Sequence, residues 1–172
     1  DVTSEGGDGN GKTYGSVSVS NNSGQVSVTG YNQPIVVVRS KLTVNGLRNT
    51  RDNLALLSSA YSDQKSLLRV WATRDFTAIS EGTQSWTDFG DGHLEYIVYD
   101  DTTGTPISFD TSKAELIFGA RVGQDTTYAT SALFEGRTDI FQTAGDMFVF
   151  TVHRENGLSA KVGVTYEFAE DI

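Results

Sequence analysis

Residues 146–153 (DMFVFTVH) decide the fold, together with residues 158–168 (LSAKVGVTYEF), which follow shortly after them. Apolar and polar residues alternate along both runs, and a third alternating run precedes them at residues 128–134. A period of two is the pattern of a β-strand with one buried face. The turn residues Arg154, Glu155, Asn156 and Gly157 separate the two later runs. We therefore predict antiparallel β-sheet in the last third of the chain.

The N-terminal region predicts a β-hairpin. Residues 14–20 (YGSVSVS) and 25–29 (QVSVT) also alternate with period two, and the turn-forming sequence NNSG lies between them. Serine occupies most outward positions, so one face of the hairpin is small and flat and suits solvent or a neighbouring subunit. The interface candidates on this hairpin are Tyr14, Val17 and Val19.

The run Ile35-Val36-Val37-Val38 predicts a strand that is covered on both faces. Four consecutive apolar β-branched residues favour this arrangement, because a strand with one solvated face alternates instead. Pro34 comes at the start of the strand, where a missing backbone donor is tolerated. Asn45-Gly46 predicts the turn that ends this region.

Residues 47–61 (LRNTRDNLALLSSAY) predict the one short helix of the chain, inserted in a loop. Thr50 or Asp52 is a suitable N-cap, and Leu54, Leu57 and Tyr61 share one helical face. We expect this insert to contact neighbouring molecules. Leu54, Leu57 and Tyr61 are therefore further interface candidates.

The whole chain predicts an all-β, antiparallel jelly-roll or β-sandwich barrel of about eight to ten strands with this one helical insert. Further strands are expected within residues 67–73, 83–87, 93–99 and 113–122, without intervening helices. Residues 1–12 are rich in glycine and predict a flexible polar arm. Residues 13–168 form a single barrel domain in this prediction, and residues 169–172 form a tail.

Composition excludes several classes of function. The chain has 172 residues, 22 of them acidic and 13 basic, a net charge of −9 and no cysteine. An acidic chain is a poor non-specific nucleic-acid binder, because phosphate contacts need clustered Lys and Arg. The lack of cysteine excludes disulfides, thiolate nucleophiles and cysteine zinc sites. Asp and Arg outnumber Glu and Lys, which is typical of proteins that stay hydrated at high salt and also of ordinary acidic extracellular β-proteins.

Residues that could take part in catalysis are scattered along the chain. Glu95 and Glu115 lie within predicted strands, where an inward carboxylate would mark a site, but we expect both to face outward. His93 and His153 each belong to a different strand, and no Gly-x-Ser-x-Gly elbow is present. We therefore expect neither turnover nor an obligatory cofactor.

Two ligand hypotheses remain open. Acidic turns offer oxygen ligands for calcium, although the EF-hand spacing is absent. The calcium candidates are Asp88, Asp91, Asp100 and Asp101. Aromatic residues offer a platform on which a sugar could stack, although such residues more often fill a core. The glycan candidates are Trp71, Trp86, Tyr96, Tyr99 and Tyr128.

The succession of a charged turn, a Gly-Asp entry, the aromatic strand MFVFTV, a tight turn and a last Val/Tyr/Phe strand over residues 141–168 is typical of viral β-barrels. With the acidic, lysine-poor composition, the chain resembles the small single-jelly-roll capsid proteins of haloarchaeal viruses with an internal membrane (sphaerolipovirus-like). The resemblance implies an upright barrel in the virion, self-association into capsomers shared with a second coat protein, and no enzymatic activity. No transmembrane segment and no direct nucleic-acid contact are expected.

Three other functions remain open from the sequence. One is a viral spike or decoration protein, which shares the fold. Another is an extracellular carbohydrate-binding or adhesin module, favoured if Trp71 and Trp86 are exposed along one groove. The third is a subunit of a cell-surface filament, in which a strand such as residues 14–20 pairs with the edge of the next subunit.

Overall fold

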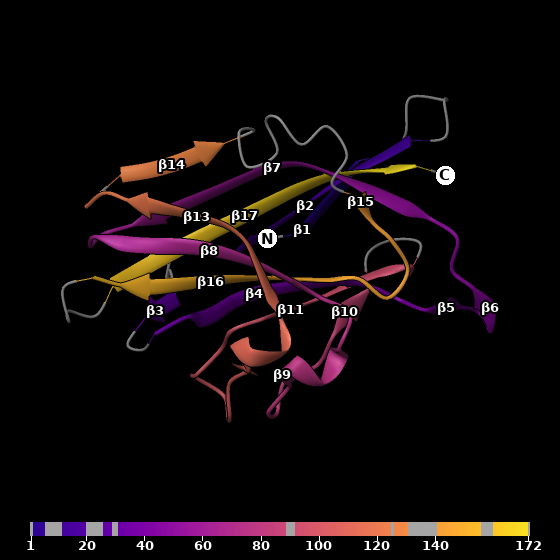
Figure 1. Cartoon of the computed structure of the whole chain (residues 1–172), viewed down its shortest axis with the longest axis horizontal. Helices are drawn as coiled ribbons and strands as arrows, with labels where there is room; N and C mark the ends of the chain where they lie inside the picture. The colour runs from indigo at the N-terminus through magenta and orange to yellow at the C-terminus, as the bar shows by residue number, and fades with distance from the viewer. Residues whose placement is uncertain are drawn as a thin grey trace.

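The computed structural model shows an all-β protein (Figure 1). It describes residues 2–5, 12–19, 26–28, 31–88, 92–124, 126–130, 141–155 and 160–171. These residues contain 17 strands, nine of which have at least five residues, and two 3-10 helices of three residues each. The predicted class, an antiparallel β-sandwich, is confirmed. The strand number exceeds the predicted eight to ten because short strands form in the connections.

The strands form two large sheets and two short ribbons. The seven-stranded sheet contains β1 (Val2–Glu5), β2 (Lys12–Val19), β3 (Val26–Val28), β7 (Asp52–Ser62), β14 (Thr126–Thr130), β15 (Phe141–Gln142) and β17 (Ala160–Asp171). The six-stranded sheet contains β4 (Gln33–Ser40), β8 (Ser66–Thr73), β10 (Thr87–Asp88), β11 (Leu94–Val98), β13 (Glu115–Val122) and β16 (Met147–Arg154). The ribbons pair β5 (Thr43–Val44) with β6 (Leu47–Arg48), and β9 (Ile79–Ser80) with β12 (Ser108–Phe109). The 3-10 helices are η1 (Phe76–Ala78) and η2 (Thr111–Lys113).

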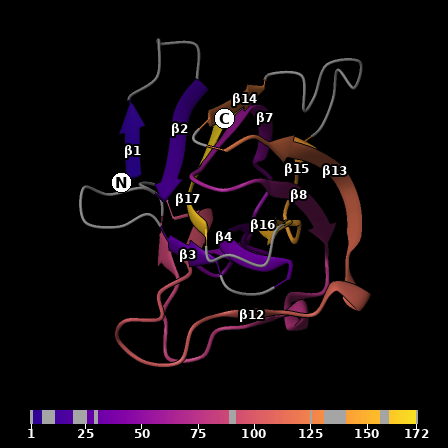
Figure 2. The ribbon, with the colours of Figure 1, turned by 90° about the vertical axis from the view of Figure 1, so that its left-hand side faces the viewer.

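Eight of these strands pair as one long antiparallel hairpin that is rolled up. β2, β4, β7 and β8 pair in turn with β17, β16, β14 and β13, so the first strand meets the last and the fourth meets the fifth. Rolling also places β17 beside β7 and β16 beside β8. This connectivity is that of a jelly roll. Figure 2 shows the strands of the two sheets around the interior, with β13 next to β14 at one margin.

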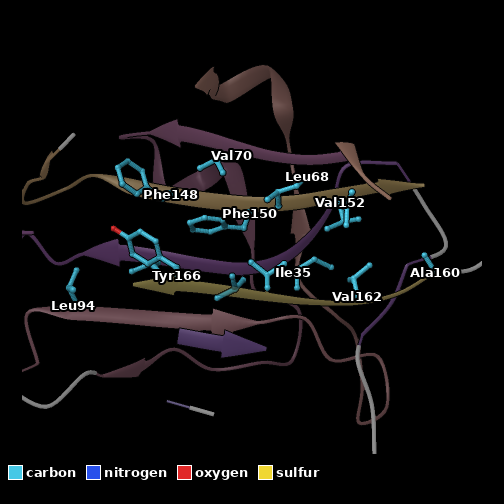
Figure 3. Close-up of a cluster of buried hydrophobic side chains, with 14 residues drawn as sticks. Ile35, Leu68, Val70, Leu94, Phe148, Phe150, Val152, Ala160, Val162 and Tyr166 are labelled. Carbon is cyan, nitrogen blue, oxygen red and sulfur yellow. The ribbon is translucent and has the colours of Figure 1, made fainter. Parts of the chain in front are cut away.

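The inner core lies between the two sheets and is almost entirely apolar (Figure 3). The rings of Phe148 and Phe150 from β16 contact that of Tyr166 from β17, with ring centroids 6.2 and 5.2 Å apart. Full burial of each large apolar side chain contributes about 1.5–3 kcal/mol. Burial also raises the pKa of Tyr166, because an ionised phenol is unfavourable in an apolar interior. The inner core comprises Ile35, Val36, Val38, Leu68, Val70, Leu94, Val122, Phe148, Phe150, Val152, Ala160, Val162, Val164 and Tyr166.

A second cluster packs on the opposite face of the six-stranded sheet. Residues 74–86 and 99–114, which we call the outer layer, belong to the connection from β8 to β13 and cover this face (Figure 1). The outer cluster comprises Val37, Ala78, Ile79, Ile97, Ile107, Met147 and Val149. Ile35, Val36 and Val38 belong to the inner core, whereas Val37 belongs to the outer cluster. The prediction that residues 35–38 are covered on both faces is therefore confirmed.

The predicted helix at residues 47–61 is wrong. Leu47–Arg48 forms β6, and the following residues form the long strand β7. β7 pairs with β17 along its length and with β14 and β15 on its other side, so tertiary hydrogen bonds override the local helical spacing. The register with β17 shifts so that Leu56 is an extra residue in β7. This bulge interrupts the period of two and makes the strand resemble a helix in the sequence.

Strands also form within the predicted arm and tail. Val2–Glu5 is β1 and pairs with β2, while residues 6–11 lie outside the described residues. β17 continues to Asp171, because β2 and β7 supply partners on both sides up to that residue. Residues 2–5 of the predicted flexible arm are thus paired in the sheet, and the predicted tail contains the end of β17.

Candidate functional site

The outer layer is attached to the sheet through a stacked arginine. The guanidinium carbon of Arg39 on β4 lies 3.7 Å from the ring centroid of Trp86 and 4.8 Å from that of Phe76. Both aromatic residues come from the outer layer, and a desolvated cation–π contact contributes up to about 2 kcal/mol. Arg39 also donates from Nε to Glu95 Oε1 at 2.5 Å. Arg39 therefore connects two strands of the sheet with the layer that covers them.

The aromatic residues considered for glycan binding are engaged in packing. Trp71 packs edge-on against Phe109 and donates from Nε1 to Thr151 Oγ1 at 2.9 Å. Trp86 donates from Nε1 to Glu81 Oε1 at 2.7 Å while it stacks on Arg39. Both tryptophans are half-buried, so the structure does not expose them along one groove. Tyr96 packs against the inner core and Tyr99 against the outer cluster, and the side chain of Tyr128 lies outside the described residues.

Glu95 faces outward from the sheet, as predicted, yet it is only 8% exposed because the outer layer covers it. Its carboxylate contacts Arg39, and its Oε2 lies 3.8 Å from Lys41 Nζ. Two cations thus surround the acid, which is the arrangement of a structural ion pair. Glu115 is exposed on β13. The sequence did not indicate the burial of Glu95, because nothing in β11 itself reports what covers its outer face.

The two histidines lie at opposite ends of the six-stranded sheet. The His93 carbonyl accepts from the Lys41 backbone N–H beyond the end of β4, and its side chain is buried. His153 pairs with Leu67 near the other end of the sheet and packs against Tyr31, with ring centroids 4.5 Å apart. Burial and the nearby Arg69 lower the pKa of His153, against an opposite effect of Glu155.

The calcium candidates that the structure describes are not brought together. Asp88 lies beside the start of β11, where its Oδ1 is 2.5 Å from Lys41 Nζ. Asp100 lies beyond the other end of β11 and accepts from the backbone N–H and hydroxyl of Thr102, which lowers its pKa. Asp101 follows it in an exposed turn, and Asp91 lies outside the described residues. In the part of the chain that the structure describes, no group of three or more acidic or histidine residues is placed to hold a metal ion.

The predicted interface candidates all lie in the seven-stranded sheet. Tyr14, Val17 and Val19 are on β2, opposite Ala169, Tyr166 and Val164 of β17. Leu54 and Leu57 are on β7, opposite Ala169 and Glu167 of β17, and Tyr61 is opposite Gly163. The side chain of Tyr61 is partly exposed, and those of the other five are outside the described residues. Their role as contact residues stays a prediction.

The clearest exposed apolar feature is the β5–β6 hairpin, which projects from one end of the roll (Figure 1). Leu42 precedes β5 and is 57% exposed, and Leu47 is the first residue of β6 and is 74% exposed. Asn45 and Gly46 form its two-residue loop with φ angles of 52° and 77°, the left-handed values that a type I′ turn requires. The hairpin is thus a well-defined element that presents leucine to solvent.

A polar pocket of about 350 Å³ lies beside the base of the hairpin. Arg74 forms part of its wall and donates to Asp146 Oδ1 at 2.6 Å and to the Ala144 carbonyl at 2.9 Å. Gly145, with φ at +89°, allows the arginine to approach this closely, because a Cβ there would lie 2.9 Å from Arg74 Nη2. The pocket lining includes Arg48, Asn49, Thr50, Asp52, Arg74 and Thr143.

Sequence reasoning did not identify Leu42, Leu47 or Arg48 as site residues. The signal was present, since Asn45-Gly46 between two apolar positions is a strong indication of a short hairpin. The sequence predicts the turn, but the helical spacing of the residues after it hides the returning strand β6.

Comparisons with known proteins assign no family to this chain. No family model matches the chain, and no curated protein matches it. One solved structure, an unassembled VP1 pentamer mutant of Washington University polyomavirus, aligns over 94% of this chain and 76% of that one, with 9% identity and a TM-score of 0.16. A similarity this low carries no argument about function. None of the helices in the described residues has the length and hydropathy to cross a bilayer.

Proposed function

We propose that this chain is a structural subunit that assembles with copies of itself and serves as a coat protein of a virus particle. The observation that carries the proposal is the projecting hairpin, which presents two exposed leucines at one end of a jelly roll. Large apolar side chains that are exposed together on one element mark an interaction site, whereas exposed apolar residues scattered singly need no explanation. When the partner is another copy, the same contact is repeated throughout a symmetric assembly.

The jelly roll suits this role because it is a rigid frame that supports the β5–β6 hairpin. Jelly rolls occur in viral capsids, and also in lectins and cupins, so the fold alone does not decide between these functions. The half-buried packing of Trp71 and Trp86 favours the coat over the glycan-binding alternative. Location in the virion and association with a second coat protein are parts of the same proposal.

The test measures the mass of the purified chain by light scattering over a range of concentrations, and images the samples by electron microscopy. We expect rings, sheets or closed particles above a threshold concentration. Leu47→Ser should raise that threshold about tenfold or more, because burying a leucine contributes about 1.5–3 kcal/mol. Leu116→Ser is the matched control, since Leu116 is an exposed leucine on β13, away from the hairpin.

The outcomes separate the candidate functions. A chain that stays monomeric at high concentration would contradict the coat proposal, and if it also binds glycans it is a carbohydrate-binding module. Open fibres in the micrographs would indicate a filament subunit. Equal effects of Leu47→Ser and Leu116→Ser would show that the hairpin is not the contact.

A further inference from the structure

The pocket beside the hairpin contains a cation that has no partner among the described residues. Arg48 follows Leu47 on β6, and its exposed guanidinium forms no ion pair or hydrogen bond with the described residues. Arg74, by contrast, is held by Asp146 and the Ala144 carbonyl. Asp52 also lines the pocket but is not within ion-pair distance of Arg48. Because Asp146 already pairs with Arg74, Arg48 is the arginine of the lining that is available for a further anion.

The base of the pocket is rigid. The buried Asn49 donates from Nδ2 to Ser40 Oγ at 3.1 Å and to the Lys41 carbonyl at 2.8 Å. Its Oδ1 accepts the backbone N–H of Arg51 at 3.0 Å. Asp146 Oδ2 accepts from both the backbone N–H and the hydroxyl of Thr143 at 2.8 Å. A pocket that is already ordered loses little entropy when it binds, which increases its affinity.

We infer that this pocket receives a carboxylate side chain of a second copy of this chain, which pairs with Arg48 while Leu42 and Leu47 bury against the same neighbour. This inference rests on the proposed function and names a contact within it. Charge complementarity identifies the occupant: the chain carries 22 acidic and 13 basic residues, so a neighbouring copy presents mainly carboxylates. Arginine is well suited to the contact, because its planar group binds a carboxylate through two parallel hydrogen bonds.

The two parts of the contact respond differently to salt. An exposed ion pair weakens as the salt concentration rises, whereas burial of leucine does not. Removal of Arg48 should therefore remove the salt-sensitive part of the association, and removal of Leu47 should weaken association at every salt concentration.

The experiment compares wild type, Arg48→Ala, Arg48→Lys and Arg48→Glu as full chains, with sedimentation velocity at low and high sodium chloride. At low salt we expect Arg48→Ala to raise the assembly threshold by about two- to fivefold, as the loss of an exposed ion pair does, and Arg48→Glu to raise it further. Arg48→Lys should keep part of the affinity, since it retains the charge but not the planar group. At high salt the wild type and Arg48→Ala should converge. Arg121→Ala is the matched control, because Arg121 is an exposed arginine paired with Glu155 on another part of the surface.

Each outcome decides the question. If the wild type assembles and Arg48→Ala assembles equally well at low salt, the carboxylate contact is wrong while the coat proposal stands. If the wild type does not assemble at any concentration, both are wrong. Thermal unfolding of each variant shows whether the fold is kept, and an equal loss in Arg121→Ala would attribute the effect to overall charge.

Discussion

The two faces of the six-stranded sheet are both buried, but they are buried in different ways. The inner face meets the other sheet through side chains that are almost all apolar and fully enclosed. The outer face meets the outer layer through a smaller apolar cluster, edged by half-buried residues such as Trp71 and Trp86 that keep polar contacts. Val36 and Val37 are adjacent and both fully buried, yet each belongs to a different cluster.

This difference distinguishes the inner core, which holds the two sheets together, from the outer layer, which covers one of them. The inner core joins strands from both halves of the rolled hairpin, so its loss disrupts the pairing of the first strands with the last. The outer layer consists of two segments of the connection from β8 to β13, and its contacts return to the sheet from which it departs. Units of this kind open locally at a lower free energy than the whole protein. We therefore expect damage to the inner core to act globally and damage to the outer layer to act locally.

The largest effect is expected for Phe150→Ala in the inner core. Phe150 is fully buried and contacts Tyr166, so its truncation leaves a large cavity. The free energy of unfolding should fall by about 3–5 kcal/mol, measured by urea denaturation. Phe109→Ala is the control from the outer layer, where Phe109 is half-buried against Trp71. An equal loss in both variants would contradict the distinction between the two faces.

A smaller and local effect is expected for Gly82→Ala in the outer layer. Gly82 has a φ of +61°, and a Cβ there would lie 2.3 Å from the Thr105 carbonyl oxygen, so the two loops must separate. Left-handed strain costs about 1–3 kcal/mol, and the displaced backbone adds to it. Hydrogen exchange should accelerate in residues 74–86 and 99–114 but not in β16 or β17.

Gly46→Ala is the matched control for this variant. Gly46 has a φ of +77°, but nothing lies within 4 Å of a Cβ placed there. Gly46→Ala therefore introduces the same left-handed backbone strain but no steric clash. If Gly82→Ala accelerates exchange in β16 and β17 as much as in the outer layer, the layer is part of the global unit rather than a separate one.

The parts of this comparison differ in how far the sequence predicts them. The run at residues 35–38 predicted a strand and its burial on both faces correctly, because side-chain periodicity is a local property. The alternation in residues 146–153 predicted the strand β16 correctly but only one buried face, whereas the outer layer also covers Met147 and Val149 on the second face. β7 was missed, since a bulge at Leu56 breaks its period and its partner β17 is about a hundred residues away. The burial of Glu95 was also missed, because it depends on a layer that comes from another part of the chain. The sequence pattern predicts strands, but it does not predict which distant segment packs over each face of a sheet, and the surroundings of the site depend on that packing.

The smallest expected effect is a change in stability on acidification, which we attribute to His153 on the outer face of the six-stranded sheet. Thr151 and His153 follow Val149 on this face, but His153 packs against Tyr31 instead of the outer cluster. Burial and Arg69 lower the pKa of His153, with Glu155 acting in the opposite sense, so the folded state favours the neutral imidazole. The unfolded chain then binds more protons once the pH falls below its ordinary pKa of about 6.5.

Stability from this residue is therefore fully present above about pH 6.5 and is lost as the pH falls through the lowered pKa. We expect His153→Gln to flatten the decrease in unfolding free energy between about pH 7 and pH 5, a range in which carboxylates contribute little. The measurement is urea denaturation of both proteins across that range. If both lose stability with the same slope, His153 is not responsible. If His153→Gln is also less stable than wild type at pH 7, the imidazole ring serves mainly as a packing partner of Tyr31. The part of the outer face around His153 would then be stabilised by packing, as the inner core is.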